Sequence, residues 1–209
     1  MRIVILGPPA SGKGTQAAIL RERHSIPQIS TGDMLRAATA AGTELGKQAA
    51  TFMSTGKLVP DEVVVGLVRE RLGGDDTKSG FILDGFPRTD AQADALGAML
   101  AELESPLDCA LQIDVDRDLL MERATLRRTD VRTGQIYHLK YNPPPPDAEL
   151  EHRADDLEET VKIRLDQYDE MTAALLPYYK EKGLLRRVDG VGDPKEVTLR
   201  IVAVLEKEK

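Results

Sequence analysis

The stretch Gly7-Pro8-Pro9-Ala10-Ser11-Gly12-Lys13-Gly14-Thr15 decides the fold of this protein because of what stands on either side of it. Before it, Arg2–Leu6 (RIVIL) is a short apolar, β-branched run, typical of a strand buried on both faces. After it, residues 15–23 (TQAAILRER) follow a helical pattern. A strand, a glycine-rich loop and a helix in this order open an α/β domain.

The same loop has the residues that a phosphate-binding site needs. Its glycines let the backbone turn with N–H groups pointing inward, and the following helix adds the positive end of its dipole. Lys13 can reach terminal phosphates, and Thr15 can place a hydroxyl on Mg²⁺. The general pattern G-x4-G-K-[ST] is missed by one residue, because Gly14 separates Lys13 from Thr15. We expect the phosphates of a ligand to contact Ala10, Ser11, Gly12, Lys13, Gly14 and Thr15.

Strand and helix patterns alternate along the rest of the chain. Short apolar runs recur at Phe81–Asp84, Asp108–Val115, Leu184–Asp189 and, more briefly, Ile26–Ile29. Helical patterns lie at Asp61–Leu72, Ala91–Leu103, Arg117–Arg128, Asp156–Met171 and Glu196–Glu206. This alternation predicts a three-layer α/β fold, in which a parallel sheet of about five strands carries helices on both faces.

Two stretches interrupt the alternation and are interpreted as insertions. Ser30–Val59 is helical in pattern but contains no strand between its helices. Thr129–Ala154 is polar and includes four consecutive prolines, and within it Tyr137–Tyr141 alternates like a short strand. We therefore expect one core spanning residues 1–209, with a helical insertion at 30–59, which we call the acceptor-side insertion, and a small insertion at 124–160, which we call the lid.

Composition excludes several classes of protein. The 209 residues are 41% hydrophobic and 30% charged, as in a globular protein with a proper core. Cys109 is the only cysteine, which excludes a disulfide scaffold. No apolar run approaches the ~18 residues of a membrane span, and no signal peptide is evident, so a cytoplasmic location is expected. The formal charge of −7 argues against nucleic acid or an anionic membrane as partner.

Three sequence blocks carry a family resemblance. The loop, as G-x-P-x-x-G-K-G-T, resembles that of nucleoside monophosphate kinases, and of adenylate kinases in particular. Pro27–Arg36 (PQISTGDMLR) resembles the entry to the monophosphate-binding insertion, and Asp84–Thr89 (DGFPRT) with Gln92 resembles the adenylate kinase signature. The resemblance implies a P-loop kinase, usually a monomer, that interconverts ATP plus AMP and two ADP with Mg²⁺. A UMP- or CMP-type kinase is the close alternative.

The resemblance also implies roles on the acceptor side. Thr31 and Gln92 would read the adenine of AMP, while Arg36 and Arg88 would hold its phosphate. The remaining positions carried over to the AMP site are Lys57, Leu58, Val59, Gly85, Phe86 and Pro87, and in the family the bond between the last two is a cis peptide. The pattern Ser30-x-x-Asp33 is also compatible with a simple helix start.

On the side that would bind ATP, the phosphoryl donor, two arginines are spaced in a way that would not stabilise a helix. Arg123 and Arg127 are predicted on one helix at i, i+4, where like charges repel unless a polyphosphate lies between them. The resemblance implies that Arg127 contacts ATP phosphates and that Arg123 packs on the ATP adenine. Arg153 and Arg164 would approach the transferring phosphates and contact AMP. Three weaker matches to the ATP base site are Ile136, Tyr137 and Gly192. The implied catalytic residues are Lys13, Arg88, Arg123, Arg153 and Arg164.

Two carboxylates are candidates for the magnesium site. Asp84 ends an apolar strand at the edge where ligands bind in such folds, and with Asp33 it would hold Mg²⁺ through water. No structural zinc is expected, because Asp130 and Thr133 occupy the spacing of the first zinc-ligand pair of some family members and the segment has no cysteine.

The charge distribution and the absence of one motif argue against a nucleic-acid-binding module and a nucleotide-dependent switch. Seven of the 28 basic residues are assigned to one cleft, and the other 21 against 35 acidic residues leave a charge of −14 elsewhere. The seven are Lys13, Arg36, Arg88, Arg123, Arg127, Arg153 and Arg164. That charge distribution suits small nucleotides and not DNA or RNA. A guanine-reading switch would need N-K-x-D, whereas Asn142, the only asparagine, is followed by Pro143.

Overall fold

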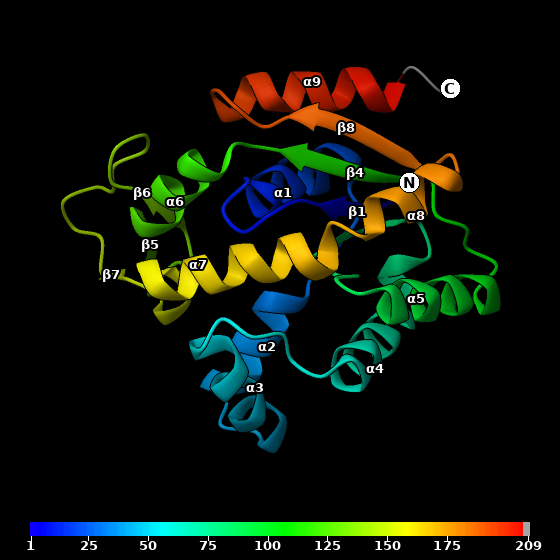
Figure 1. Cartoon of the computed structure of the whole chain (residues 1–209), viewed down its shortest axis with the longest axis horizontal. Coiled ribbons are helices and arrows are strands. Elements are labelled where there is room, and N and C mark those ends of the chain that lie inside the picture. Colours follow the sequence, from blue (N-terminus) through cyan, green and yellow to red (C-terminus); the bar gives the residue numbers. More distant parts are fainter. Residues whose placement is uncertain (207–209) are drawn as a thin grey trace.

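A computed structural model describes residues 1–206 and shows a three-layer α/β fold (Figure 1). Five parallel strands form the central sheet in the order β2-β3-β1-β4-β8. They are β1 (Arg2–Leu6), β2 (Gln28–Ser30), β3 (Phe81–Asp84), β4 (Cys109–Asp114) and β8 (Leu185–Asp189). The predicted fold class and sheet are therefore confirmed.

Helices cover both faces of this sheet (Figure 1). One core cluster joins the sheet to α4, α5 and α8, and the other joins it to α1, α6, α7 and α9. Along β1, Ile3 and Ile5 belong to one cluster and Val4 and Leu6 to the other, which explains the continuous apolar run. The helices are α1 (Lys13–His24), α2 (Thr31–Ala40), α3 (Glu44–Ser54), α4 (Asp61–Leu72), α5 (Asp90–Glu102), α6 (Arg117–Thr125), α7 (Glu158–Gln167), α8 (Leu175–Glu181) and α9 (Pro194–Glu206).

The strand order creates a crevice at one edge of the sheet. From β1 the chain first builds β2 and β3 on one side, and then β4 and β8 on the other. In α/β sheets, ligands bind beyond the carboxyl ends of the strands where the order reverses in this way. Ile5 pairs with Asp84 in register, so the glycine-rich loop after β1 and the Gly85 turn after β3 face the same crevice.

A long helical segment passes between the central sheet and α2 in the view of Figure 1 (α7, yellow). It comprises a 3-10 turn (Ala154–Asp156), α7, a π-helical turn (Tyr168–Thr172) and α8, where the sequence predicted one helix over Asp156–Met171. Val161 of α7 packs in one core cluster, whereas Leu175 of α8 packs in the other. The wider π turn therefore lies where the buried face of the segment changes.

One predicted helix is wrong at its end. The pattern suggested a helix over Arg117–Arg128, but α6 ends at Thr125 and the chain continues as β5 (Arg127–Asp130). Arg123 and Arg127 therefore do not share a helix face. Strand pairing is the physical reason, because β5 lies between β6 (Ile136–His138) and β7 (Leu150–Glu151) in a separate antiparallel sheet. The short strand expected at Tyr137–Tyr141 is accordingly found slightly earlier, as β6.

Within residues 1–206, none of the helices has both the length and the apolar character that crossing a bilayer requires.

Candidate active site

The loop between β1 and α1 folds around the ammonium group of Lys13. Its Nζ donates to the carbonyl oxygens of Gly7 and Pro8, both at 2.8 Å. A side chain at Gly7 would bring a Cβ within 2.7 Å of the Ile113 carbonyl oxygen, so only glycine fits there. Burial lowers the pKa of Lys13 to about 7, although the charge of Asp84 opposes the shift. The loop thus holds a cation that a phosphate would favour in its charged form.

Oxygen groups suited to a magnesium ion lie beside this loop. Asp84 is 9% exposed at the end of β3, and burial raises its pKa against the opposing charge of Lys13. The Ser11 hydroxyl is buried and makes no hydrogen bond within the described part of the chain. Residues 1–206 contain no cluster of three His, Cys, Asp or Glu able to hold a metal by themselves. This donor set fits Mg²⁺, which typically binds through one or two carboxylates, waters and substrate phosphates.

The acceptor-side candidates surround a cavity of about 560 Å³. It brings together residues from α2, the α3–α4 connection, the turn after β3 and α5, which are far apart in the sequence. The predicted residues that line it are Thr31, Arg36, Lys57, Leu58, Val59, Gly85, Arg88, Gln92 and Arg164.

The Gly85 carbonyl oxygen accepts two hydrogen bonds from side chains at this cavity. One comes from the Thr31 hydroxyl at 2.9 Å and the other from Arg88 Nε at 2.7 Å. Gly85 has a φ of +77°, and a Cβ there would approach the Arg88 guanidinium to 2.9 Å. Phe86, fully buried in the core, precedes Pro87 through a cis peptide bond, as the resemblance implied. The signature turn therefore places Arg88 and Thr31 together.

A second cavity, of about 530 Å³, lies between the loop and the first one. Lys13 lines only the second cavity, whereas Arg88 and Arg164 line both. Donor and acceptor phosphates in the two cavities would therefore meet at these two arginines. Sequence reasoning missed Thr172 in the π turn, which lines the second cavity and donates to the Arg88 carbonyl oxygen at 3.0 Å. Nothing in the local pattern distinguishes that threonine from any other helical one.

Two consecutive carboxylates hold Arg127 of β5 and Arg164 of α7, together called the lid arginines. Arg127 makes a bidentate pair with Asp156 at 2.8 and 2.5 Å, and the Asp156 side chain is fully buried. Burial acts to lower the pKa of Arg127, but Asp156 outweighs it and the pKa is raised. Arg164 donates to the Asp155 carbonyl oxygen and pairs with its carboxylate at 3.0 Å. Sequence reasoning placed Asp156 only at the start of a predicted helix and gave Asp155 no role in the site.

The other charged side chains of the two sides also interact electrostatically with one another. Burial, followed by the charges of Arg36 and Arg127, lowers the pKa of Arg153. Burial also lowers the pKa of Arg164 to about 10. Asp33 pairs with Arg36 at 2.5 Å, and its charge raises the pKa of Asp84. The two candidate magnesium carboxylates are thus electrostatically coupled.

Of the residues predicted to bind ATP in the described chain, Lys13 alone lines one of the two cavities. Those that line neither are Ala10, Ser11, Gly12, Gly14, Thr15, Arg123, Arg127, Ile136, Tyr137 and Gly192. Arg123 donates to the Gly190 carbonyl oxygen at 3.1 and 3.2 Å, which places it at the turn between β8 and α9. Gly192 lies in that same turn, whereas Ile136 and Tyr137 belong to β6, on the outer sheet. The parts expected to hold the ATP base therefore come from three separate elements.

Comparison with known proteins gives consistent matches over this whole arrangement. The sequence model of a family described as "Adenylate kinase" matches residues 5–184. The adenylate kinase of Sorangium cellulosum (strain So ce56) is 57% identical over 208 residues, covering 98% of this chain and 96% of the relative. That of Thermodesulfovibrio yellowstonii is 53% identical over 215 residues, covering all of both chains. That of Archaeoglobus fulgidus is 51% identical over 216 residues, with the same coverage.

Proposed function

The chain belongs to the adenylate kinase family and is a nucleotide phosphotransferase, and we propose how its cleft moves the γ-phosphoryl group of ATP to AMP. One observation carries the assignment of residues: Arg88 and Arg164 line both the cavity beside the loop and the cavity beside Thr31. A group passing from one cavity to the other meets both guanidinium groups. A UMP- or CMP-type kinase is not favoured, since the full-length relatives are adenylate kinases.

Catalysis then rests on position and charge rather than on proton transfer. The attacking AMP oxygen is already an anion near neutral pH, so no general base is required. Lys13 and the loop N–H groups hold the donor phosphates, and Arg36 and Arg88 hold AMP. The guanidinium groups of Arg123, Arg127, Arg153 and Arg164 enclose the moving group and stabilise its spread-out charge.

Asp155 and Asp156 support the proposed role of the lid arginines. A guanidinium has five N–H donors in a planar fork, so a bidentate carboxylate leaves donors available for phosphate. Asp156 orients Arg127 in this way, and Asp155 orients Arg164. Arginines held before the substrate binds lose less conformational entropy when they contact it.

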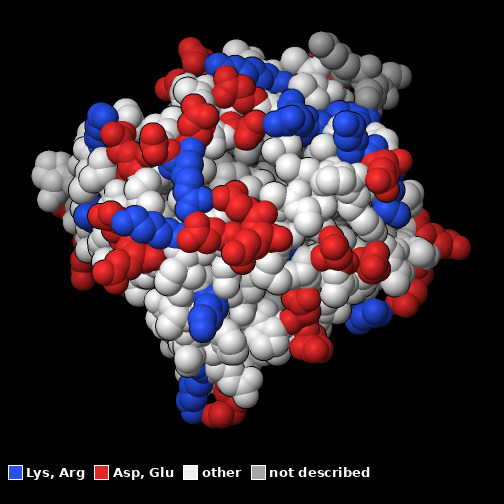
Figure 2. Space-filling model, in the orientation of Figure 1, with Lys and Arg blue, Asp and Glu red and all other residues white. Residues whose placement is uncertain are grey.

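Magnesium, the quaternary state and the location belong to the proposal as well. Mg²⁺, held through water by Asp84 with Asp33, would supply charge neutralisation of the phosphate oxygens when bound. We propose a cytoplasmic monomer that requires no structural zinc. We also propose that it binds neither nucleic acid nor membranes, because its formal charge is −7 and because positive and negative side chains are interspersed on the one face shown in Figure 2.

A coupled assay of ADP formation tests this function directly. Initial rates with ATP should be highest for AMP and lower for UMP, CMP and GMP; if AMP is a poor acceptor, the substrate assignment is wrong. Lys13→Ala should lower kcat at least ~100-fold with the fold intact, because a phosphate-binding charge is lost. Near-wild-type turnover in this variant would show that the role of Lys13 is misassigned.

A further inference from the structure

The side-chain amide of Gln92 is held in one orientation. Gln92 lies in the first turn of α5, is 1% exposed and lines the acceptor cavity. Its Oε1 accepts from the backbone N–H of Arg88 at 2.8 Å, and its Nε2 donates to Asp61 Oδ1 at 2.6 Å. A backbone N–H can only donate and a carboxylate can only accept. Because each partner has one possible role, the amide cannot be turned over without losing both bonds.

Asp61, at the first position of α4, is itself held by a second contact. Its Oδ2 accepts from the Thr89 hydroxyl at 2.7 Å. The same hydroxyl caps α5 by accepting from the Gln92 backbone N–H at 3.2 Å. Asp61 therefore receives hydrogen bonds on both oxygens, from two residues of one helix start. It does not line the acceptor cavity, so its influence on a ligand passes through Gln92.

Counting donors and acceptors shows what the amide can still bind. A primary amide has two N–H donors and an oxygen with two acceptor positions. Arg88 and Asp61 use one acceptor and one donor, which leaves one of each for a ligand in the cavity. Such a pair matches the amino donor and neighbouring ring-nitrogen acceptor of adenine, as in glutamine–adenine recognition generally. A 6-oxopurine presents the opposite pair, an acceptor at position 6 and a donor at N1.

We propose that Asp61 is a positioning residue that sets the base specificity of the acceptor site. It holds the Gln92 amide in the orientation that accepts a 6-aminopurine monophosphate and rejects a 6-oxopurine one. The inference rests on the proposed function, in which Gln92 contacts the acceptor base. Without the carboxylate, only the Arg88 N–H still opposes the reversed orientation, so the amide is held less firmly and more often presents its donor to a 6-oxo group.

The test compares AMP with inosine monophosphate, which differs only by the 6-oxo group and the N1 proton. Asp61→Leu removes both acceptors with little change in shape, and Asp61→Ala does the same with a smaller side chain if the leucine variant fails to fold. The ratio of kcat/KM for AMP to that for inosine monophosphate should fall at least ~10-fold, while KM for ATP stays unchanged. Equilibrium binding of the two monophosphates should show the same loss of selectivity.

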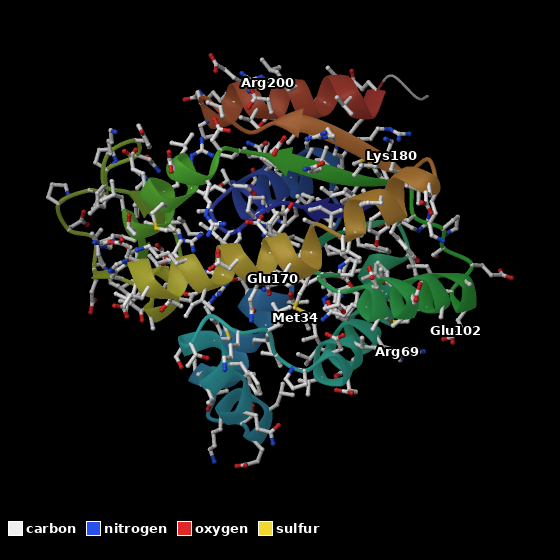
Figure 3. All side chains as sticks on the ribbon, in the orientation of Figure 1. Met34, Arg69, Glu102, Glu170, Lys180 and Arg200 are labelled. Atoms are coloured by element: carbon white, nitrogen blue, oxygen red, sulfur yellow. The ribbon has the colours of Figure 1, made fainter. Side chains whose placement is uncertain are left out.

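Matched controls separate positioning from structural support. Glu102→Ala removes another polar contact between α4 and α5, a 2.7 Å pair between Arg69 and Glu102 (Figure 3). Glu62→Ala removes the exposed carboxylate next to Asp61. Both should keep the wild-type ratio, because a purely structural defect weakens the two substrates equally.

The outcomes are distinguishable. A folded, active Asp61 variant with the wild-type selectivity would overturn the inference alone. A wild-type chain that fails to phosphorylate AMP would instead overturn the proposed function and this inference with it.

Discussion

The acceptor-side insertion and the lid are built on opposite principles. On the acceptor side, Leu35, Ala49, Val59 and Val64 belong to the same core cluster as the central strands. In the lid sheet, β5 to β7, the buried residues are the polar Thr129 and Asp130. The large apolar side chains of that region are exposed at Val131, Ile136, Leu139, Tyr141 and Leu150. One region is thus an extension of the core, and the other stands apart from it.

The same difference holds for the residues expected to touch nucleotides. Thr31, Arg88 and Gln92 are each bonded to neighbouring protein groups at one cavity. Ile136 is 41% exposed on the outer sheet, and with Tyr137 it lines neither cavity among residues 1–206. The candidate AMP residues are therefore already held together by the fold, whereas the candidate ATP-base residues of the lid lie away from both cavities. Adenylate kinases are themselves a standard example of closure by a lid.

The largest effect is expected from a substitution on the acceptor side. Arg88→Ala should lower kcat at least ~100-fold, since it removes a charge facing both cavities and about 3 kcal/mol of transition-state stabilisation. Steady-state kinetics with ATP and AMP will measure it. Arg132→Ala, an exposed arginine within the lid, is the control and should keep kcat within about 3-fold. Equal losses in both variants would remove the contrast between the two regions.

Stability should show the contrast next. Leu35→Ala, at a side chain 6% exposed, should cost about 2–5 kcal/mol of unfolding free energy, because it leaves a cavity in the shared core. Leu139→Ala, at a lid residue 42% exposed, should stay within about 0.5 kcal/mol. Urea unfolding measures both. A lid substitution as costly as the core one would show that the lid shares the main core.

A smaller effect should be confined to the lid. Asp130 is 3% exposed, and its carboxylate accepts from the Arg132 backbone N–H at 2.8 Å. Asp130→Ala should cost about 1–2 kcal/mol locally, because that N–H loses its partner. Hydrogen exchange should speed up in β5 to β7 and not in the central sheet, and KM should rise for ATP but not for AMP. Glu149→Ala, at an exposed lid carboxylate, is the control, and faster exchange throughout the protein would contradict the prediction.

The smallest predicted effect is the uptake of a fraction of a proton when ATP binds. Since the pKa of Lys13 is lowered to about 7, the group is largely neutral at pH 8 before ATP binds. Donor phosphates favour its charged form, so ATP binding should take up less than one proton, whereas AMP, held by arginines, should take up little. Calorimetry in buffers of different ionisation enthalpy measures the uptake, and Lys13→Met should abolish it. Equal uptake with both nucleotides would contradict the assignment.

Lys13 also affects stability, in a direction that follows from its pKa. The unfolded chain holds this proton up to the ordinary pKa of 10.5, while the folded protein releases it near 7. The cost of burying the charged ammonium is therefore present in full below pH 7, and it is relieved as the pH rises toward 10.5. The Lys13→Met variant, compared with wild type by urea unfolding across this range, should lack the contribution.

Local patterns predicted well wherever neighbouring residues determine the structure. Arg2–Leu6, Phe81–Asp84 and Asp61–Leu72 form the expected elements with the expected bounds. The loop of glycines between a strand and a helix needs no distant partner to turn. The prediction that a helix reaches Arg128 was wrong. The helix ends at Thr125 because the following residues form β5, which pairs with the more distant segments β6 and β7.

The sequence alone determined the layered fold, because apolar period and glycine placement are local properties, and its motifs predicted the phosphate loop and the candidate residues through a family resemblance. Only the tertiary structure decided which residues orient the candidates. Thr89 reaches Asp61 across 28 residues, and Thr172 reaches the Arg88 carbonyl oxygen across 84. Hydrogen bonds of this kind depend on how separate elements pack against each other, and single-chain periodicity carries no information about that packing.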